Sequence, residues 1–366
     1  MLTFLIFLPL LLTYTVIAVY AERKISAFIQ DRMGPMEVGF NGIFQTIADL
    51  FKLLQKEDIK PDAVDRWLFL LAPAVIFTAI FAGFAVIPLS PGISGSLAEI
   101  GIYYLLAIVS LDVIGILMAG WGSNSKFSLF GAIRSVAQII SYEIPLGLSV
   151  LCVVMVSQSL NLQEISYQQG TIWAYVDSDA KNYLFGLAAW GVDISHIGGF
   201  LSWNVVRVPF LSLAFVIFFI SSLAESNRAP FDLPESESEL VGGFHTEYSG
   251  FRWALIMLSE YAMMLLVSLL GAILFLGSWN TPFLNMGVVR LADWTSGTPG
   301  TVISNLWGIF WLLSKALLLV AIQMWVRWTY PRLRVDQLMS LCWKYLIPAS
   351  FLLLMMSGLW RMVMIA

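Results

Sequence analysis

The chain has 366 residues, of which 59% are hydrophobic and 12% charged, with a net charge of −4 and a mean hydropathy of +0.81. A typical soluble domain carries roughly 25% charged residues, so the composition excludes a soluble globular enzyme, a disordered chain and a secreted disulfide scaffold. It also provides no basic field for nucleic acid. We therefore expect an all-α polytopic membrane protein that forms a single membrane domain over residues 1–366.

Eight apolar runs are long enough for membrane spans, which need about 20 residues each. The predicted spans, in chain order, are 2–21, 67–88, 101–121, 137–159, 206–224, 254–277, 304–326 and 345–365. No basic region precedes the first run, so no cleavable signal peptide is expected. The segment 160–205 is a long connection on the outer side. Its tryptophans and tyrosines suit a membrane interface, but its function is not predicted.

An amphipathic helix is predicted at 41–56, in the loop between the first two spans. Six apolar residues fall on one helical stripe, and Gln45, Asp49, Lys52 and Lys56 lie opposite. The pattern leaves two interpretations open. The helix either lies passively in the headgroup layer, or it covers a cavity with Asp49 and Lys52 directed toward the inside or a partner subunit.

Ionisable residues interrupt several of the later spans. Asp112, Glu143, Glu260 and Lys315 each fall inside an apolar run. A charge at membrane depth costs a few kcal/mol or more, so such residues usually face a bundle interior and mark an ion or substrate path. Taken singly, each residue could also snorkel or pair with a neighbouring helix.

The loop 225–253 is acidic, although it follows a span on the side where bases are expected. Between residues 225 and 247, Arg228 and His245 are the only basic residues. The same stretch contains six carboxylates: Glu225, Asp232, Glu235, Glu237, Glu239 and Glu247. A solvated acidic turn is one interpretation. Its embedded apolar, glycine and proline residues favour a packed loop instead. Crowded carboxylates at low dielectric raise one another's pKa, which is what a proton relay needs.

Basic residues predict the orientation. The four loops 22–66, 122–136, 225–253 and 327–344 together contain 15 lysines and arginines, and the opposite side contains 4. The positive-inside rule therefore places these loops in the cytoplasm and both termini outside. Cys152 and Cys342 are far apart and match no metal or redox spacing. The former lies in an apolar run, the latter in a polar connection, and both are expected to be inert. Two histidines are too few for a histidine-based metal or haem site.

Five sequence blocks resemble a known family, the H subunit of proton-translocating NADH:quinone oxidoreductase (respiratory complex I). They are ERKISAFIQDRMGPMEVGFNGIFQTIADLFKLLQKEDIKP, AGWGSNSKFSLFGAIRSVAQIISYE, AESNRAPFDLPESESELVGGFHTEYSG, SEYAMM and WVRWTYPRLRVDQLMSLCWK. The resemblance covers nearly the whole chain. It implies eight transmembrane helices in a bacterial inner membrane, docked to other membrane subunits and to a peripheral redox arm.

The resemblance also implies site residues. The chain would hold no cofactor, would bind quinone as substrate at the membrane end of a chamber, and would rely on partner subunits for FMN and iron–sulfur clusters. Quinone-binding residues, by motif position, are Arg23, Phe28, Arg32, Asp49, Lys52, Arg228 and Phe231. A proton-coupling path would comprise Glu143, Glu225, Asp232, Glu235, Glu237, Glu239, Glu247 and Glu260. Neither ubiquinone nor menaquinone is favoured.

Three residues depart from the family pattern, namely Met36, Phe40 and Asp112, so the resemblance assigns no role to Asp112. Two other functions are alternatives. The membrane subunit of an energy-converting hydrogenase-type complex shares the general plan, but NRAPFDLPE and IADLFKLLQKE favour the quinone enzyme. A secondary transporter would favour inverted repeats and helices broken near the midplane, and neither is visible.

Overall fold

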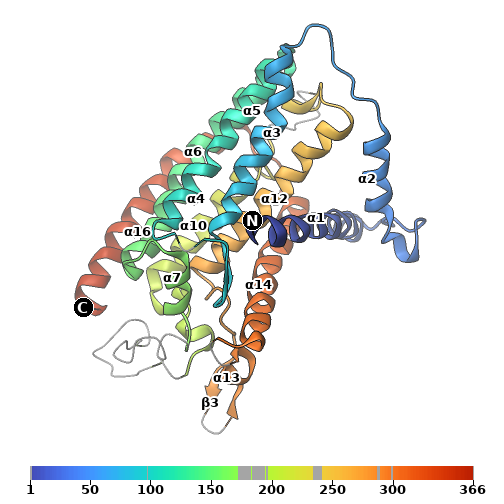
Figure 1. Ribbon diagram of the computed structural model, residues 1–366. Helices are drawn as coiled ribbons and strands as arrows, with labels where there is room; N and C mark the ends of the chain where they lie inside the picture. The colour runs from blue at the N-terminus through green and yellow to red at the C-terminus, as the bar shows by residue number, and fades with distance from the viewer. Residues whose placement is uncertain are drawn as a thin grey trace.

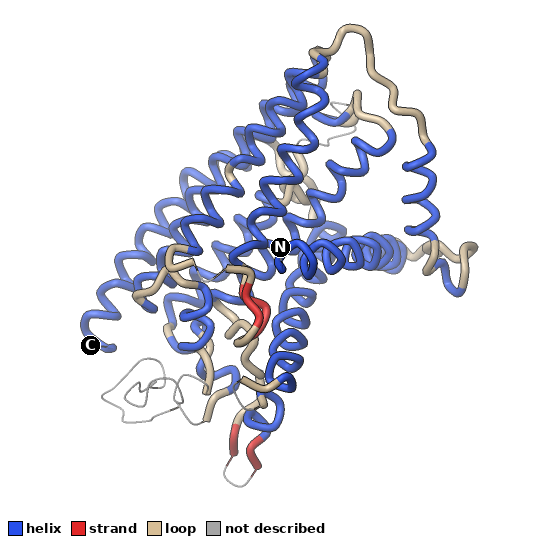
Figure 2. The backbone as a smooth tube through the Cα atoms, viewed as in Figure 1, coloured by secondary structure: helices blue, strands red, loops and turns tan. Residues whose placement is uncertain are grey.

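The computed structural model describes residues 2–96, 98–171, 183, 194, 197–233, 241–286, 289–297 and 300–365. Within this part the chain is almost entirely helical (Figures 1 and 2). The helices up to residue 168 are α1 (Leu2–Ile29), α2 (Gln45–Gln55), α3 (Arg66–Gly83), α4 (Gly101–Val109), α5 (Leu111–Gly122), α6 (Lys126–Ser157) and α7 (Leu162–Gln168). The later ones are α9 (Asn204–Arg207), α10 (Pro209–Glu225), α12 (Gly250–Leu274), α13 (Leu291–Ser296), α14 (Val302–Thr329), α15 (Val335–Ser340) and α16 (Ile347–Trp360).

Shorter elements complete the described chain. The 3-10 turns are η1 (Phe40–Gly42), η2 (Phe84–Val86), η5 (Gly199–Ser202) and η6 (Gly243–His245), and the π-helical turns are η7 (Leu341–Leu346) and η8 (Arg361–Ile365). Two small antiparallel hairpins pair β1 (Pro88–Ser90) with β2 (Ile93–Ser94) and β3 (Asn285–Met286) with β4 (Val289–Arg290). Both lie in connections between helices, and β1 packs against α14.

Seven helical stretches of the described chain are long and apolar enough to cross a membrane, and α10 is a shorter apolar helix of 17 residues. These properties confirm an all-α polytopic membrane protein. The third stretch is α4 and α5 together, with a break at Ser110, and the last runs continuously from α15 through η7 to α16.

Helix α12 lies at the centre of the bundle. In its most apolar segment 83% of the residues are buried, whereas in the corresponding segment of the last stretch only 17% are buried. It packs against α3, α10 and α14. Helices α3, α5, α6 and α16 run side by side, while α2 lies at the edge of the bundle and contacts α1 and α12 (Figure 1).

Local capping explains several helix ends. The side chain of Asp65 accepts from the Trp67 amide at the start of α3, and Thr301 caps α14 by accepting from the Ser304 amide. These bonds satisfy amides that the first turn of a helix leaves without partners. Helix α6 ends at Ser157 and is followed by Gln158, whose φ of 55° is left-handed.

A proline inside α6 creates a contact with the last helical stretch. Pro145 has no amide hydrogen, so it leaves the carbonyl of Ser141 without its helical donor. The thiol of Cys342 donates to that carbonyl over 3.0 Å. Cys342 is thus a buried residue within a helical stretch, whereas the sequence pattern predicts a polar connection at this position. Its thiol joins α6 to η7.

Candidate functional site

A buried ion cluster joins α1 to three distant segments. One carboxylate oxygen of Glu22 lies 3.6 Å from Arg228 and also accepts a hydrogen bond from Arg327. The other accepts from the hydroxyl of Tyr261 over 2.6 Å. The Arg228 guanidinium lies 4.4 Å from the centre of the Tyr261 ring. Glu22 is 6% exposed, and it can stay ionised at this depth because two guanidinium groups surround it.

A second ion pair ties α1 to α2. Arg23 donates to Asp49 over 2.6 Å, and the Lys52 ammonium lies 3.5 Å from the other oxygen of that carboxylate. Burial alone would raise the pKa of Asp49, but the hydrogen bond and charge of Arg23 outweigh it and hold the pKa below its ordinary value. The pair therefore holds the start of α2 near the end of α1 at neutral pH.

Beside this pair, the ends of α1 and α2 present a large apolar surface. Phe28 is 88% exposed and Met33 87%. The exposed apolar side chains of η1 and α2 and the turn between them are Phe40, Ile43, Phe44, Ile47, Leu50, Phe51 and Leu54. Soluble proteins rarely expose so much contiguous apolar area, so such a surface marks contact with lipid, another subunit or an apolar ligand.

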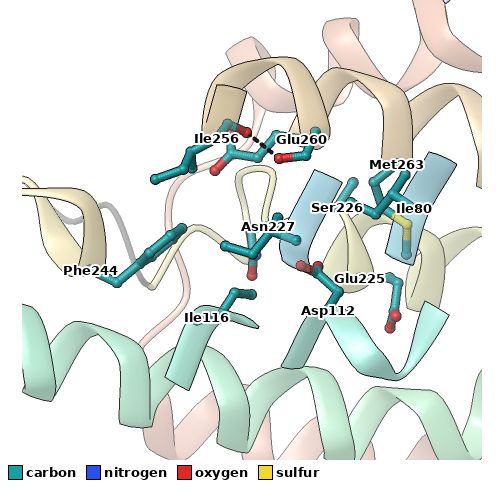
Figure 3. Close-up of a pocket in the computed structure, with 12 residues that line it drawn as sticks. Ile80, Asp112, Ile116, Glu225, Ser226, Asn227, Phe244, Ile256, Glu260 and Met263 are labelled. Atoms are coloured by element: carbon teal, nitrogen blue, oxygen red, sulfur yellow. Dashed lines mark hydrogen bonds between the residues drawn. The ribbon is translucent and has the colours of Figure 1, made fainter. Parts of the chain in front are cut away.

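Carboxylates from four helices line two small cavities inside the bundle. The first is lined by Asp112 of α5, Glu225 of α10 and Glu260 of α12, together with Asn227 (Figure 3). The second is lined by Glu143 of α6 and again by Glu225. Each cavity has room for about one water molecule. Glu225 and Met263 line both, so the two cavities adjoin at these side chains.

The break between α4 and α5 positions side chains beside the two cavities. Ser110 forms the break, and its hydroxyl hydrogen-bonds to Glu143 on α6. Asp112 lies two residues later, in the first turn of α5, where unpaired amides favour a negative group. Asp112 is 7% exposed, and its Oδ1 has no hydrogen-bond partner among the described residues. The same holds for Oε2 of Glu225. These oxygens are available to bind a water or a proton.

The other predicted site residues are dispersed. Asp232 is buried and pairs with Arg332 over 2.8 Å, and Phe231 packs against Tyr142 with ring centres 5.2 Å apart. Arg32 is exposed and bonds to nearby Gln30. Glu247 is half-buried in the turn before α12 and lines neither cavity. Glu235, Glu237 and Glu239 lie outside the described residues.

Sequence reasoning missed Glu22 and gave no role to Asp112. Glu22 begins a charged run at the end of an apolar one, which resembles an ordinary span boundary. The one feature of the sequence that could have indicated its role is an acidic residue at the start of a loop rich in basic residues. Asp112 was recognised as an intramembrane charge, but only the packing of α5 against α3 and α6 brings it to the cavity of Glu225.

The fold and site define a multi-pass membrane protein with buried carboxylates at helix junctions. Among the residues that the structure describes, no group of His, Cys, Asp and Glu could hold a metal ion. Residues 1–358 match the family described as NADH dehydrogenase. The chain belongs to this family, in the branch of the H subunit of NADH-quinone oxidoreductase, respiratory complex I.

Its similarity to curated relatives extends over nearly its full length. It is 61% identical over 353 residues to one of the NADH-quinone oxidoreductase H subunits of Cytophaga hutchinsonii, covering 96% of each chain. It is 48% identical to the H subunit of Chlorobium luteolum, covering 95% of this chain and 84% of that one. For the H subunit of Rubrobacter xylanophilus the identity is 43%, over 95% and 92%. The chain is thus a multi-pass inner-membrane component of this oxidoreductase.

Proposed function

We propose that this chain forms the membrane end of the quinone-binding chamber and couples quinone reduction to proton translocation. Other membrane subunits and the redox arm would surround it, with FMN and iron–sulfur clusters in partner subunits and both termini on the outer side. The observation that carries the proposal is the pair of adjoining cavities lined by Asp112, Glu143, Glu225 and Glu260.

The apolar surface at α1 and α2 supports an entrance for quinone from the lipid. A quinone has an apolar tail and ring with two carbonyl oxygens, so it needs an apolar path with a few fixed polar groups. The exposed side chains around Phe28 and Phe51 supply apolar contact, and the Arg23–Asp49 pair supplies the polar edge. Of the two interpretations of the amphipathic helix, this arrangement favours the one in which the helix covers a cavity.

The ion cluster at Glu22 supports a connection between this entrance and the interior. Arg228 and Phe231 belong to one loop, and the former contacts Glu22 of α1 and Tyr261 of α12. Glu260 is the residue before Tyr261 and lines the first cavity. Tyr261, which contacts the ion cluster, is therefore the next residue along α12 from Glu260, which lines the cavity. A change of charge in the cluster could thus affect the carboxylates of the cavity.

The coupling step follows from charge balance. Reduction of the quinone by two electrons from a partner's cluster creates negative charge, and two protons must arrive to give the quinol. In our proposal that negative charge raises the proton affinity of the nearest carboxylate. Glu225, shared by both cavities, would then exchange a proton with Asp112 or Glu260 on one side and Glu143 on the other. The two adjoining cavities would in this way transmit the change of protonation away from the quinone.

Replacing Glu225 tests this role. Glu225→Gln keeps the shape and removes the ionisable group, so we expect quinone-linked proton pumping to fall by at least about a hundredfold, the lower end of the range typical for loss of a positioned proton-transfer group. Pumping is measured as acidification in inverted membrane vesicles, with assembly verified by native electrophoresis. Glu99→Gln, at an exposed position away from the cavities, is the matched control. Wild-type pumping and quinone reduction in the assembled Glu225→Gln complex would refute the assignment.

A further inference from the structure

Arg207 is a buried cation at the end of the bundle that carries the C-terminus. It lies at the end of α9, directly before the membrane helix α10, and is 8% exposed. Its Nε atom is buried without a hydrogen-bond partner, and no ion pair involves it among the described residues. A buried charge without a counter-charge is strongly destabilising, so an anion from outside the described chain is expected here.

A second arginine increases the positive charge at this position. Arg361 donates to the Val156 carbonyl over 2.6 Å and to the Gln158 side chain over 3.2 Å. The Val156 carbonyl is free to accept because α6 ends at Ser157, and the last turn of a helix leaves carbonyls without donors. These bonds hold the Arg361 guanidinium at the end of α6. Arg361 directly follows Trp360, whose ring packs on Phe210 of α10, so the two arginines lie at the same end of two adjoining helices.

The surroundings are those of a membrane interface. Arg207 lies two residues before the first residue of α10, and Arg361 follows the last residue of α16, so both lie at the ends of adjoining membrane helices. Phe210 and Trp360 pack edge to face with ring centres 5.5 Å apart. The indole Nε1 of Trp360 is also buried without a partner among the described residues. Aromatic side chains and arginines at one level characterise the headgroup region.

Apolar side chains continue from this position into the span. Leu213 and Val216 are exposed on α10, and Met355 and Leu359 are exposed on α16. They lie deeper along the same two helices than the arginines do. A molecule with a phosphate at the level of the arginines and acyl chains along these helices would satisfy both the charge and the apolar surface.

We propose that Arg207 and Arg361 bind the phosphate of an anionic phospholipid headgroup between α10 and α16. Arginine suits this role because its planar group of donors matches phosphate oxygens in bidentate geometry. The exposed apolar side chains beside the arginines favour a lipid over free phosphate or a carboxylate of a neighbouring subunit. This site is independent of the proposed quinone and proton functions.

Photo-labelling of the intact complex tests the proposal. The complex is reconstituted in phosphatidylcholine with a minor fraction of phosphatidylglycerol that carries a photoreactive group on an acyl chain. Labelled peptides are mapped by mass spectrometry. We expect label on 209–225 and 347–360 in the wild type, and about a tenfold loss in the Arg207→Gln/Arg361→Gln variant, because charge-assisted bonds to phosphate contribute most of the headgroup affinity. Arg290→Gln, which removes an exposed arginine elsewhere, is the matched control and keeps the label.

Competition separates the possible sources of the anion. Unlabelled phosphatidylglycerol should displace the label, whereas inorganic phosphate and excess phosphatidylcholine should not. The paired lysine variant Arg207→Lys/Arg361→Lys should retain part of the label, since it keeps the charge but loses the bidentate geometry. Equal labelling of the wild type and the glutamine variant would overturn the proposal. So would displacement by inorganic phosphate, or a wild type without label whose arginines cross-link to a carboxylate of another subunit.

Discussion

The charge of Glu22 should be required for the stability of the subunit. Glu22→Gln preserves the shape and an oxygen that can still accept from Tyr261, so it removes mainly the negative charge between Arg228 and Arg327. At 3.6 Å and an effective dielectric constant of about 20, the attraction between Glu22 and Arg228 alone amounts to about 4 to 5 kcal/mol before desolvation is subtracted. Removing one partner of a buried pair typically costs about 3 to 5 kcal/mol.

We therefore expect Glu22→Gln to destabilise the assembled subunit by about 3 kcal/mol, within this range. The assay is thermal denaturation of the purified complex, with the assembled fraction followed on native gels. Adding Arg327→Gln should recover part of the loss, because it removes one of the two guanidinium groups that then repel each other. Adding Arg66→Gln, an exposed arginine, should recover nothing.

Two results would refute this reasoning. One is a Glu22→Gln complex as stable as the wild type, which would mean that the cluster holds no net negative charge on Glu22. The other is equal recovery by Arg327→Gln and Arg66→Gln, which would attribute the effect to net charge and exclude the local cluster.

Two further predictions concern packing. Lys315 donates to the carbonyls of Ser278 and Asn280 over 2.8 and 2.6 Å and lies 4.2 Å from the Trp203 ring centre. Lys315→Met should lower the stability of the complex by about 2 kcal/mol, because two buried carbonyls lose their donor. Lys344→Met, at an exposed position, is the control. Equal stability of the two variants would contradict this role of Lys315. A Cβ on Gly131 of α6 would lie 2.8 Å from the Phe244 amide nitrogen, so Gly131→Ala should destabilise by about 1 to 3 kcal/mol. Gly147→Ala in the same helix meets no atom within 4 Å and should be neutral or stabilising, and a similar melting temperature for the two alanine variants would contradict the packing argument.

Composition and local pattern were sufficient for the class of protein and for most helices. Apolar runs specify membrane helices because every backbone group in lipid must be bonded within its own segment, a constraint that the sequence carries locally. The amphipathic stripe of α2 is also a local feature, because residues three and four apart in the sequence lie on the same face of a helix. The ends of the helices were harder to predict from the sequence. An apolar run ends at its first charge, whereas α1 continues to Ile29 because Glu22 and Arg23 find partners on other segments.

The site depended on tertiary structure. Glu22, Arg228 and Arg327 lie far apart in the chain and become one cluster only when α1, the loop after α10 and α14 pack together. Asp112 joins Glu225 and Glu260 because α5 breaks from α4 at Ser110 and α12 fills the centre of the bundle. The sequence by itself determined that this chain is a membrane protein of helices with a few costly charges inside. Only the tertiary structure decided which charges share a cavity, because the counter-charge that allows an ion to be buried is supplied by residues distant in sequence.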